Sequence, residues 1–267
     1  MAKAKIVQRD AAELAGTPKR FRYFEVVCLL AFPAVAFCLA RSAYGPMLEA
    51  PLMIPLALLT GYLGADFVSG FAHWTFDTWW SPDTPIIGRT FVRTFREHHV
   101  DQTAITRHDF VETNGSNSLA ALSLAGTGFA LRGDESSRFG AFMAATFFVA
   151  ALCTSVTSQI HKWAHMKRPP AVIRFLQRAR VIITKDAHSL HHAAPYAKSY
   201  CITCGWLNPS LNFLRFFPVL ERMISWVTGA IPRADDIGKE AALAIAEIEK
   251  AKAVSVESEA RVTEEAP

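Results

Sequence analysis

All nine histidines of the chain lie between residues 73 and 192, and their spacing is that of metal ligands. His161 and His165 are four residues apart, so they would share one face of a helix. His188, His191 and His192 repeat this pattern at spacings of three and four residues. Because neutral imidazole is the commonest side-chain ligand for metal ions, the pattern predicts a metal centre.

Two adjacent histidines and a histidine–aspartate pair add to this set. His98 and His99 are neighbours, so on a helix their side chains point about 100° apart and could serve two different ions. His73 and Asp77 are one helical turn apart. A single histidine of this kind is more often a hydrated surface residue or a core residue. So many pairs in one region favour metal binding instead.

The number of imidazoles bears on the identity of the metal. Structural zinc takes four ligands and catalytic zinc three, and the HExxH motif of zinc proteases is absent from the sequence. Two iron ions in nitrogen-rich shells would use all the histidines, and imidazole suits iron. We therefore expect two iron ions that activate O2.

Carboxylates near the histidines are further candidates. Asp66 is an ionisable residue inside an apolar run, seven residues before His73, and such residues are functional candidates in membranes. Its alternative role is a hydrogen bond to a polar neighbour such as Gln159 or Ser158. The carboxylates that could fix the imidazoles by hydrogen bonds are Asp101, Asp109 and Glu112.

Four apolar runs must position these residues, and they indicate an all-α integral membrane protein. The runs cover residues 23–40, 51–73, 118–131 and 139–160. A helix needs about 20 apolar residues to cross a bilayer. The second and fourth runs meet this length and the first nearly does, whereas the third is short and could be a buried or re-entrant segment.

The distribution of Lys and Arg favours four transmembrane helices. If every run crosses, residues 1–22, 74–117 and 161–204 share one side with 18 Lys and Arg, against 3 in residues 41–50 and 132–138. Positively charged loops remain cytoplasmic. We therefore expect both termini and all the histidines on the cytoplasmic side of the membrane.

The chain divides into three predicted parts. Residues 1–22 are a basic cytoplasmic leader, residues 23–232 a membrane domain, and residues 233–267 a polar tail. Within the domain, residues 206–231 are apolar but interrupted by charges and prolines, as in a helix that lies at the membrane interface. The leader lacks the short apolar core of a cleaved signal peptide.

Composition limits the other functions. The chain has 267 residues, of which 51% are hydrophobic and 19% charged, and its net charge is only +4. With no nucleic-acid-binding motif, this charge excludes nucleic acid as the expected partner. An odd number of cysteines, five, argues against a disulfide framework. Cys201 and Cys204 form one CxxC, which is half a zinc site, a redox pair or a structural feature.

A longer set of motifs resembles the plasmanylethanolamine desaturase family. The matching segments are FAHWTFD (71–77), FREHHVDQTAITRHDFVETNG (95–115), HKWAH (161–165), HSLHHAAP (188–195) and YCITCGWLN (200–208). The resemblance covers about residues 61–217. It implies a di-iron membrane lipid desaturase that uses O2 to convert the sn-1 alkyl ether chain of a plasmanyl phospholipid to the vinyl ether of a plasmalogen.

The resemblance also implies particular site residues. The metal ligands would be His73, Asp77, His98, His99, His108, His161, His165, His188, His191 and His192. Catalytic roles are expected for Asp77 and His108, and the position of Asp66 adds that residue; His108 could instead lie beside the ligands, next to Asp109. Basic residues that could meet a lipid phosphate, or else be ordinary cytoplasmic charge, are Arg89, Arg93, Arg96 and Arg107.

Other functions stay open at the level of sequence. An acyl-lipid desaturase or a lipid hydroxylase would use the same site, with the lipid in an apolar channel between the second and fourth runs. A membrane metal carrier or sensor, or a protein with a structural metal, is less compatible with histidines gathered on one side. No GxGxxG dinucleotide motif is present. Electrons must therefore come from a separate cytochrome b5-like or ferredoxin-like protein with its reductase.

Overall fold

The computed structural model describes residues 8–9, 14, 19–134 and 137–248, and within them the regular elements are all helices. The expected all-α class is therefore confirmed. The long helices are α2 (Lys19–Glu49), α3 (Met53–Thr78), α5 (Phe110–Leu131) and α6 (Arg138–Ser155). The shorter elements are η1 (Gly88–Val92), α4 (Arg93–Val100), η2 (Ala104–Thr106), α7 (Thr157–His165), α8 (Ala171–Arg178), α9 (Lys185–Ser189), α10 (Asn208–Phe213), α11 (Phe216–Thr228) and α12 (Ala234–Ile237). Residues 239–248 are also helical.

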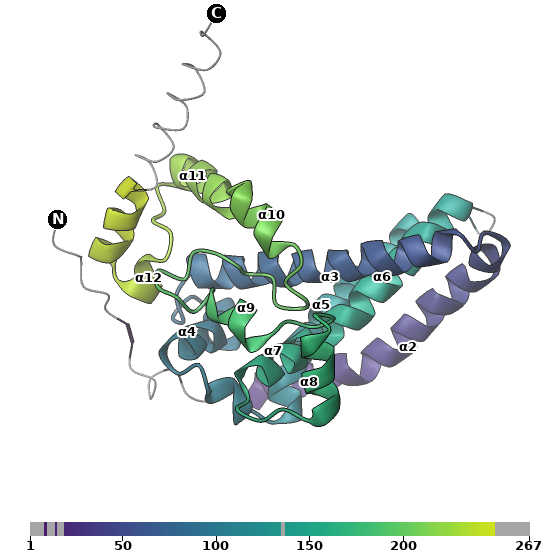
Figure 1. Cartoon of the computed structure of the whole chain (residues 1–267), viewed down its shortest axis with the longest axis horizontal. Helices are drawn as coiled ribbons and strands as arrows, with labels where there is room; N and C mark the ends of the chain where they lie inside the picture. The colour runs from purple at the N-terminus through teal and green to yellow at the C-terminus, as the bar shows by residue number, and fades with distance from the viewer. Residues whose placement is uncertain (1–7, 10–13, 15–18, 135–136, 249–267) are drawn as a thin grey trace, which may run out of the picture.

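The four long helices form a bundle that extends to one side of the molecule (Figure 1). Helix α2 packs against α5 and α6, and α3 packs against α6. Ala121, Ala125 and Ala144 are fully buried in its core. At Gly61 of α3, an added Cβ would lie 2.5 Å from the carbonyl oxygen of Thr146 in α6. Small residues allow this close approach of backbones, as they do between helices in membranes.

Three helices are long and apolar enough to cross a membrane among the residues described: Arg20–Glu49, Met53–Thr78 and Arg138–His165. Helix α5 has 22 residues, so it is about 33 Å long, and it lies against α2 and α6. It contains the short third apolar run, residues 118–131. Four crossings thus stay a prediction, while the three apolar spans are found.

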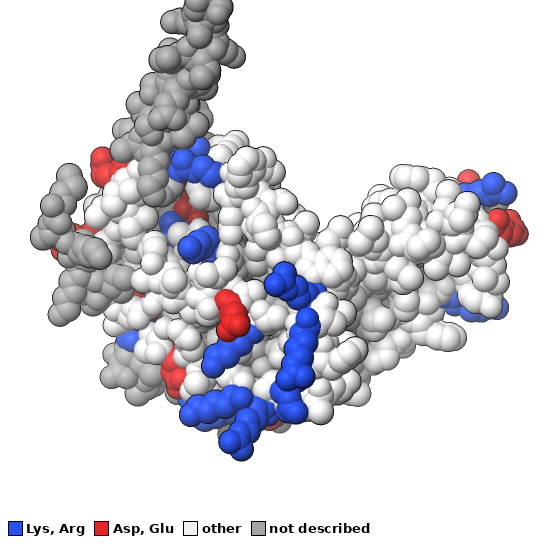
Figure 2. Space-filling model, in the orientation of Figure 1, with Lys and Arg blue, Asp and Glu red and all other residues white. Residues whose placement is uncertain are grey.

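The turns that connect the long helices lie at one end of the bundle, and the histidine-bearing helices lie at the other end. In Figure 1 the α2–α3 and α5–α6 connections lie at the right-hand end of the bundle, and α4, α7 and α9 lie at the other end. Figure 2 shows the projecting arm as uncharged on this face except near its tip. The last span is interrupted at Val156, between α6 and α7, before it reaches the histidines.

The last described part of the chain combines exposed apolar helices with buried charged side chains. Helices α10 and α11 expose large apolar side chains, with Phe213 87% and Trp226 88% exposed, as an interfacial segment requires. Arg233 and Asp236, in contrast, are 4% and 2% exposed. Nη1 and Nη2 of Arg233 donate to the two carboxylate oxygens of Glu221 at 2.7 and 2.8 Å. The first residues of the predicted polar tail, Arg233 and Asp236, are therefore buried against the rest of the protein.

Candidate metal centre

The fold gathers histidines from four segments into two neighbouring groups. Helix α3 contributes its last two turns, α4 its C-terminal turn, α7 its C-terminal half, and α9 contributes together with the residues that follow it. The first group is His98, His161, His165, His188 and His192, and the second is His73, Asp77, His99 and His191. In each group the potential ligand atoms lie within 4.8 Å of one another.

The first group is made only of imidazoles, and their Nε2 atoms converge. The Nε2 of His188 lies 2.8 Å from that of His161 and 2.9 Å from that of His192. The Nε2 of His192 is also 2.9 Å from that of His98, and His165 is 3.3 Å from His161. Imidazole nitrogens bound about 2.1 Å from an ion at right angles would lie about 3.0 Å apart. The spacing therefore fits a single bound metal ion.

Burial keeps the imidazoles of this group neutral. It lowers the pKa of His98 and His188 well below the usual value, and neighbouring histidines lower both further. Burial also lowers the pKa of His192 to about 2. A neutral imidazole has a free lone pair on one nitrogen, which is what a metal ion requires. The group is thus suited to bind a metal cation rather than protons.

The second group contains a carboxylate. Oδ2 of Asp77 lies 3.3 Å from Nε2 of both His73 and His191, and Oδ1 lies 3.5 Å from Nε2 of His99. Both oxygens of Asp77 and both ring nitrogens of His73 are buried without a hydrogen-bond partner among the described residues. Leaving a buried charged group unsatisfied is costly. A metal ion at this point would satisfy these atoms, so the residues fit one.

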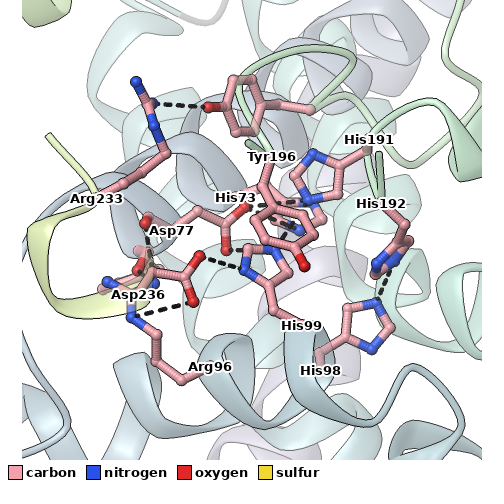
Figure 3. A network of polar contacts seen from close by, with 12 residues as sticks. His73, Asp77, Arg96, His98, His99, His191, His192, Tyr196, Arg233 and Asp236 are labelled. Atoms are coloured by element: carbon pink, nitrogen blue, oxygen red, sulfur yellow. Dashed lines mark hydrogen bonds and ion pairs between the residues drawn. The ribbon is translucent and has the colours of Figure 1, made fainter. Parts of the chain in front are cut away.

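Hydrogen bonds from residues outside the second group orient two of its rings. Nδ1 of His99 lies 2.7 Å from Oδ2 of Asp236 (Figure 3). Nδ1 of His191 lies 3.1 Å from the carbonyl oxygen of Lys198. Each contact places the proton on Nδ1 and leaves Nε2 as the ligand atom. Tyr196 stacks on the His99 ring, with centroids 4.2 Å apart. Burial lowers the pKa of His99, but the carboxylates of Asp77 and Asp236 outweigh it and raise the pKa.

Asp236 is the residue that sequence reasoning missed. The carboxylates expected to hold the imidazoles make other contacts: Asp101 pairs with Arg107 at 2.6 Å. Asp109 caps α5 by accepting from the N–H groups of residues 111 and 112. Among the described histidines, Glu112 pairs with His108 alone, and its Oε1 lies 3.9 Å from Nε2 of that ring. Asp236 is 137 residues from His99 in sequence, so no local pattern could have found it.

His108 is the one expected ligand that the structure places in neither group. Its Nε2 lies 3.5 Å from Oε2 of Glu97. Its side chain lines a cavity of about 90 Å³ together with His98 and His161 of the first group. His108 is therefore beside the candidate metal site rather than part of the ligand set.

Asp66 is also outside both groups, and its surroundings are structural. It is fully buried, and Oδ1 accepts from the N–H groups of Cys204 and Gly205 at 2.8 Å each. Oδ2 accepts from the N–H of Leu207 at 3.2 Å. Its partners are thus backbone groups of a loop and not the expected Gln159 or Ser158. The carboxylate fixes this loop against α3.

The CxxC pair lies in the same loop. Cys201 and Cys204 are both free and buried. Burial raises the pKa of the Cys204 thiol to about 12 and raises that of Cys201 as well. Neutral buried thiols are poor metal ligands and poor nucleophiles. This favours the structural interpretation of the pair.

The arginines considered for phosphate binding take structural positions in two cases. Arg93 is fully buried, where it donates to the Leu14 carbonyl oxygen and to Glu97. Arg96 is 2% exposed and donates to the backbone oxygen atoms of Phe76 and Asp77. These two residues hold α4 in place, and this burial does not favour a contact with a lipid phosphate.

Comparison with known proteins agrees with this site. A lipid desaturase domain model matches residues 62–235. The plasmanylethanolamine desaturase of Myxococcus xanthus is 46% identical over 90% of this chain and 85% of its own length. Plasmanylethanolamine desaturase 1 of Mus musculus is 40% identical over 86% of each chain. A chloroplastic fatty acid desaturase 4 of Arabidopsis thaliana is 34% identical over 73% of this chain and 59% of its own.

No solved structure matches the chain. The domain match spans every histidine of the two groups and ends one residue before Asp236. The resemblance found in the motifs is thereby confirmed over most of the chain. The chain belongs to the lipid desaturase family and, within it, to the plasmanylethanolamine desaturases.

Proposed function

We propose that this protein is a membrane desaturase that converts the sn-1 alkyl ether chain of a plasmanyl phospholipid to the vinyl ether of a plasmalogen. The observation that carries the proposal is the pair of buried ligand groups in a chain 46% identical to a protein named for this activity. The apolar spans that lead to the groups agree with a substrate that resides in the bilayer.

Nine residues form the proposed ligand set. His98, His161, His165, His188 and His192 would hold one metal ion, and His73, Asp77, His99 and His191 the other. Iron bound at both groups would supply the reduction of O2 and the removal of hydrogen from an unactivated methylene. The set is rich in nitrogen and contains no thiolate, which suits iron.

The protein's own residues position the ligands and their protons. Asp236 and the Lys198 carbonyl keep a proton on Nδ1 of His99 and of His191, which leaves each Nε2 free to bind. Arg96 donates to the backbone of Asp77 and fixes the end of α3 against α4. We retain His108 as a catalytic candidate outside the ligand set, because it lines the cavity that reaches His98 and His161.

We also propose four membrane crossings, with both termini and the metal centre on the cytoplasmic side. Support comes from the 18 Lys and Arg that then share this side. The α2–α3 and α5–α6 connections lie together at the far end of the bundle (Figure 1), as four crossings require. Helix α5 would be the fourth crossing, shielded from lipid in part by α2 and α6.

Each turnover requires electrons from outside the protein. Forming the double bond removes two hydrogen atoms from the lipid. Reducing O2 to two water molecules takes these and, in addition, two electrons and two protons. The sequence has no dinucleotide-binding motif. The donor is therefore a separate one-electron carrier of the cytochrome b5 or ferredoxin kind, reduced by its own reductase.

An acyl-lipid desaturase is the second candidate. A relative named as a fatty acid desaturase is 34% identical over 73% of this chain, and this likeness supports acyl-chain chemistry as the alternative. A metal carrier or sensor is less compatible with the burial. His73 and His191 are fully buried and His188 is 1% exposed, which does not suit rapid exchange of metal.

A lipid assay separates these functions. The chain is expressed in a host that lacks plasmalogens and supplies a cytochrome b5 donor, and the cells are fed an alkylglycerol. We expect acid-labile vinyl ether lipids with the native protein and none with His161→Ala. Unsaturated or hydroxylated acyl chains in place of vinyl ethers, from a protein that holds iron, would identify the second candidate instead.

A further inference from the structure

We propose that a basic hollow beside the metal centre is the docking surface for an acidic protein that carries one electron at a time. The hollow has a volume of about 1020 Å³ and lies between α7, α8 and α9. Its charged lining consists of Lys167, Arg174, Arg178, Arg180, Lys185 and a single carboxylate, Asp186. The inference rests on the proposed function, because that function requires an external electron donor.

The positive charge of this basic hollow is not neutralised by ion pairs among the residues that the structure describes. Among the described residues none of its five basic side chains forms an ion pair, although Arg174 donates to the Pro169 carbonyl oxygen at 2.8 Å. Clustered charge of one sign around a concave surface raises the local potential and speeds the association of an oppositely charged partner. An acidic protein is therefore the partner that this charge fits.

The position of the hollow fits electron transfer better than substrate binding. Its wall includes Ala164 and Ala187, which directly precede His165 and His188 of the first ligand group. None of the histidines is part of the lining. A lipid in the hollow would therefore not touch the candidate metal site. Electrons can cross this single layer of protein, whereas a lipid chain cannot.

A membrane surface is the other occupant to consider. The exposed apolar side chains of α8, Val172 and Phe175, are not part of the lining, although a membrane contact would use them. Two exposed large apolar side chains, Leu190 and Trp206, do line the hollow, against five basic ones. In Figure 2, Lys and Arg on this face spread over the half that lies beyond the uncharged arm, rather than only along the edge of the arm. All five basic side chains of the hollow are exposed, so a protein can reach them.

The electron donor supplies the electrons that the reduction of O2 requires beyond those taken from the lipid. Two reduced donor molecules each give one electron per turnover and leave in the oxidised form. Together with two protons from solvent and two hydrogen atoms from the lipid, these electrons reduce O2 to two water molecules. Repeated docking calls for a weak and fast interface, which charge complementarity provides.

The test uses iron-loaded, full-length protein in lipid nanodiscs and the soluble haem domain of cytochrome b5 as the acidic donor. Stopped-flow absorbance gives the second-order rate of haem oxidation by the protein in the presence of O2. The charge-reversed variant is Lys167→Glu with Arg178→Glu, both at exposed positions. The matched control is Arg20→Glu with Arg222→Glu, also exposed but outside the hollow.

We expect the variant to oxidise the haem domain about 10- to 100-fold more slowly at low salt, with a weaker dependence on ionic strength. The control should match the native protein. Reduction by dithionite, which needs no docking, should stay within about twofold for all three proteins. The native protein should also lose its advantage when the surface carboxylates of the haem domain are amidated.

Three results would overturn the docking surface. They are an unchanged haem oxidation rate in the variant, an equal loss with dithionite, and no preference of the native protein for the unmodified haem domain. A variant that alters only the dependence on anionic lipid in the nanodisc would assign the hollow to the membrane. Charge-dependent haem oxidation without vinyl ether product would leave the docking surface standing and reject the proposed lipid reaction.

Discussion

The contact between Asp236 and His99 gives the sharpest prediction about the metal centre. Replacing Asp236 by Asn removes the negative charge but keeps an oxygen that can accept from Nδ1 of His99. Replacing it by Ala removes the acceptor altogether. Because His99 belongs to the second ligand group only, either change should weaken the binding of one metal ion and leave the binding of the other unchanged.

The size of the effect follows from the geometry of this contact. The 2.7 Å distance joins side chains that are 0% and 1% exposed, so solvent does not screen the interaction. Loss of such an outer carboxylate typically costs about 10- to 100-fold in metal affinity. A charge-assisted hydrogen bond is about twice as strong as a neutral one. We therefore expect about a tenfold loss for Asp236→Asn and about a hundredfold loss for Asp236→Ala.

The assay is iron content per chain after a chelator titration, measured by mass spectrometry of the metal. The neighbouring carboxylate provides the matched control, because Asp235 is 25% exposed and pairs with Arg9. Asp235→Asn should keep the native titration curve. The reasoning fails if Asp236→Ala holds both ions as tightly as the native protein, or if the control loses iron equally. Circular dichroism would establish that the variants keep their helices.

Three further predictions concern stability and the residues outside the ligand groups. Gly61→Ala should destabilise the protein by about 1–3 kcal/mol, because its Cβ would lie 2.5 Å from the Thr146 carbonyl oxygen; Gly126→Ala, with nothing within 4 Å, should not, and equal thermal stabilities would contradict this packing. The Cys204→Ala variant should keep its iron. Burial raises the pKa of the Cys204 thiol in the folded state to about 12, so the native protein should lose stability as the pH rises above about 8.5, the ordinary pKa of a thiol. The variant should lose less stability over the same pH range. His108→Ala should still bind two iron ions, and loss of one would make His108 a ligand after all.

The sequence could predict the ligands because local spacing carries that information. His161 and His165 share a face of α7, and the HxxHH segment places three rings on α9 and the turn after it. Both spacings depend only on the helical repeat. The alternation of apolar runs and basic loops predicted that every histidine lies at one end of the helix bundle. The structure places them at that end.

The remainder depended on contacts between distant segments. The role of Asp66 is set by three N–H groups of a loop more than 130 residues away, whose backbone path has no sequence signature. Asp236 reaches His99 because the chain returns from α11 to the end of α3, where the N–H of Arg233 donates to the Thr78 carbonyl oxygen at 2.7 Å. A charged stretch near the end of a chain is usually solvated, so it resembled a tail.

The central claim is that the two ligand groups act on the alkyl ether chain, and isotope labelling tests it most directly. Purified, iron-loaded protein in nanodiscs receives a plasmanyl phospholipid with two deuterium atoms on each of the first two carbons of the alkyl chain, together with the reduced haem domain and O2. We expect a vinyl ether product that has lost two of the four deuterium atoms. An alkyl chain that keeps all four, with new unsaturation or a hydroxyl group in the acyl chain, would contradict the account.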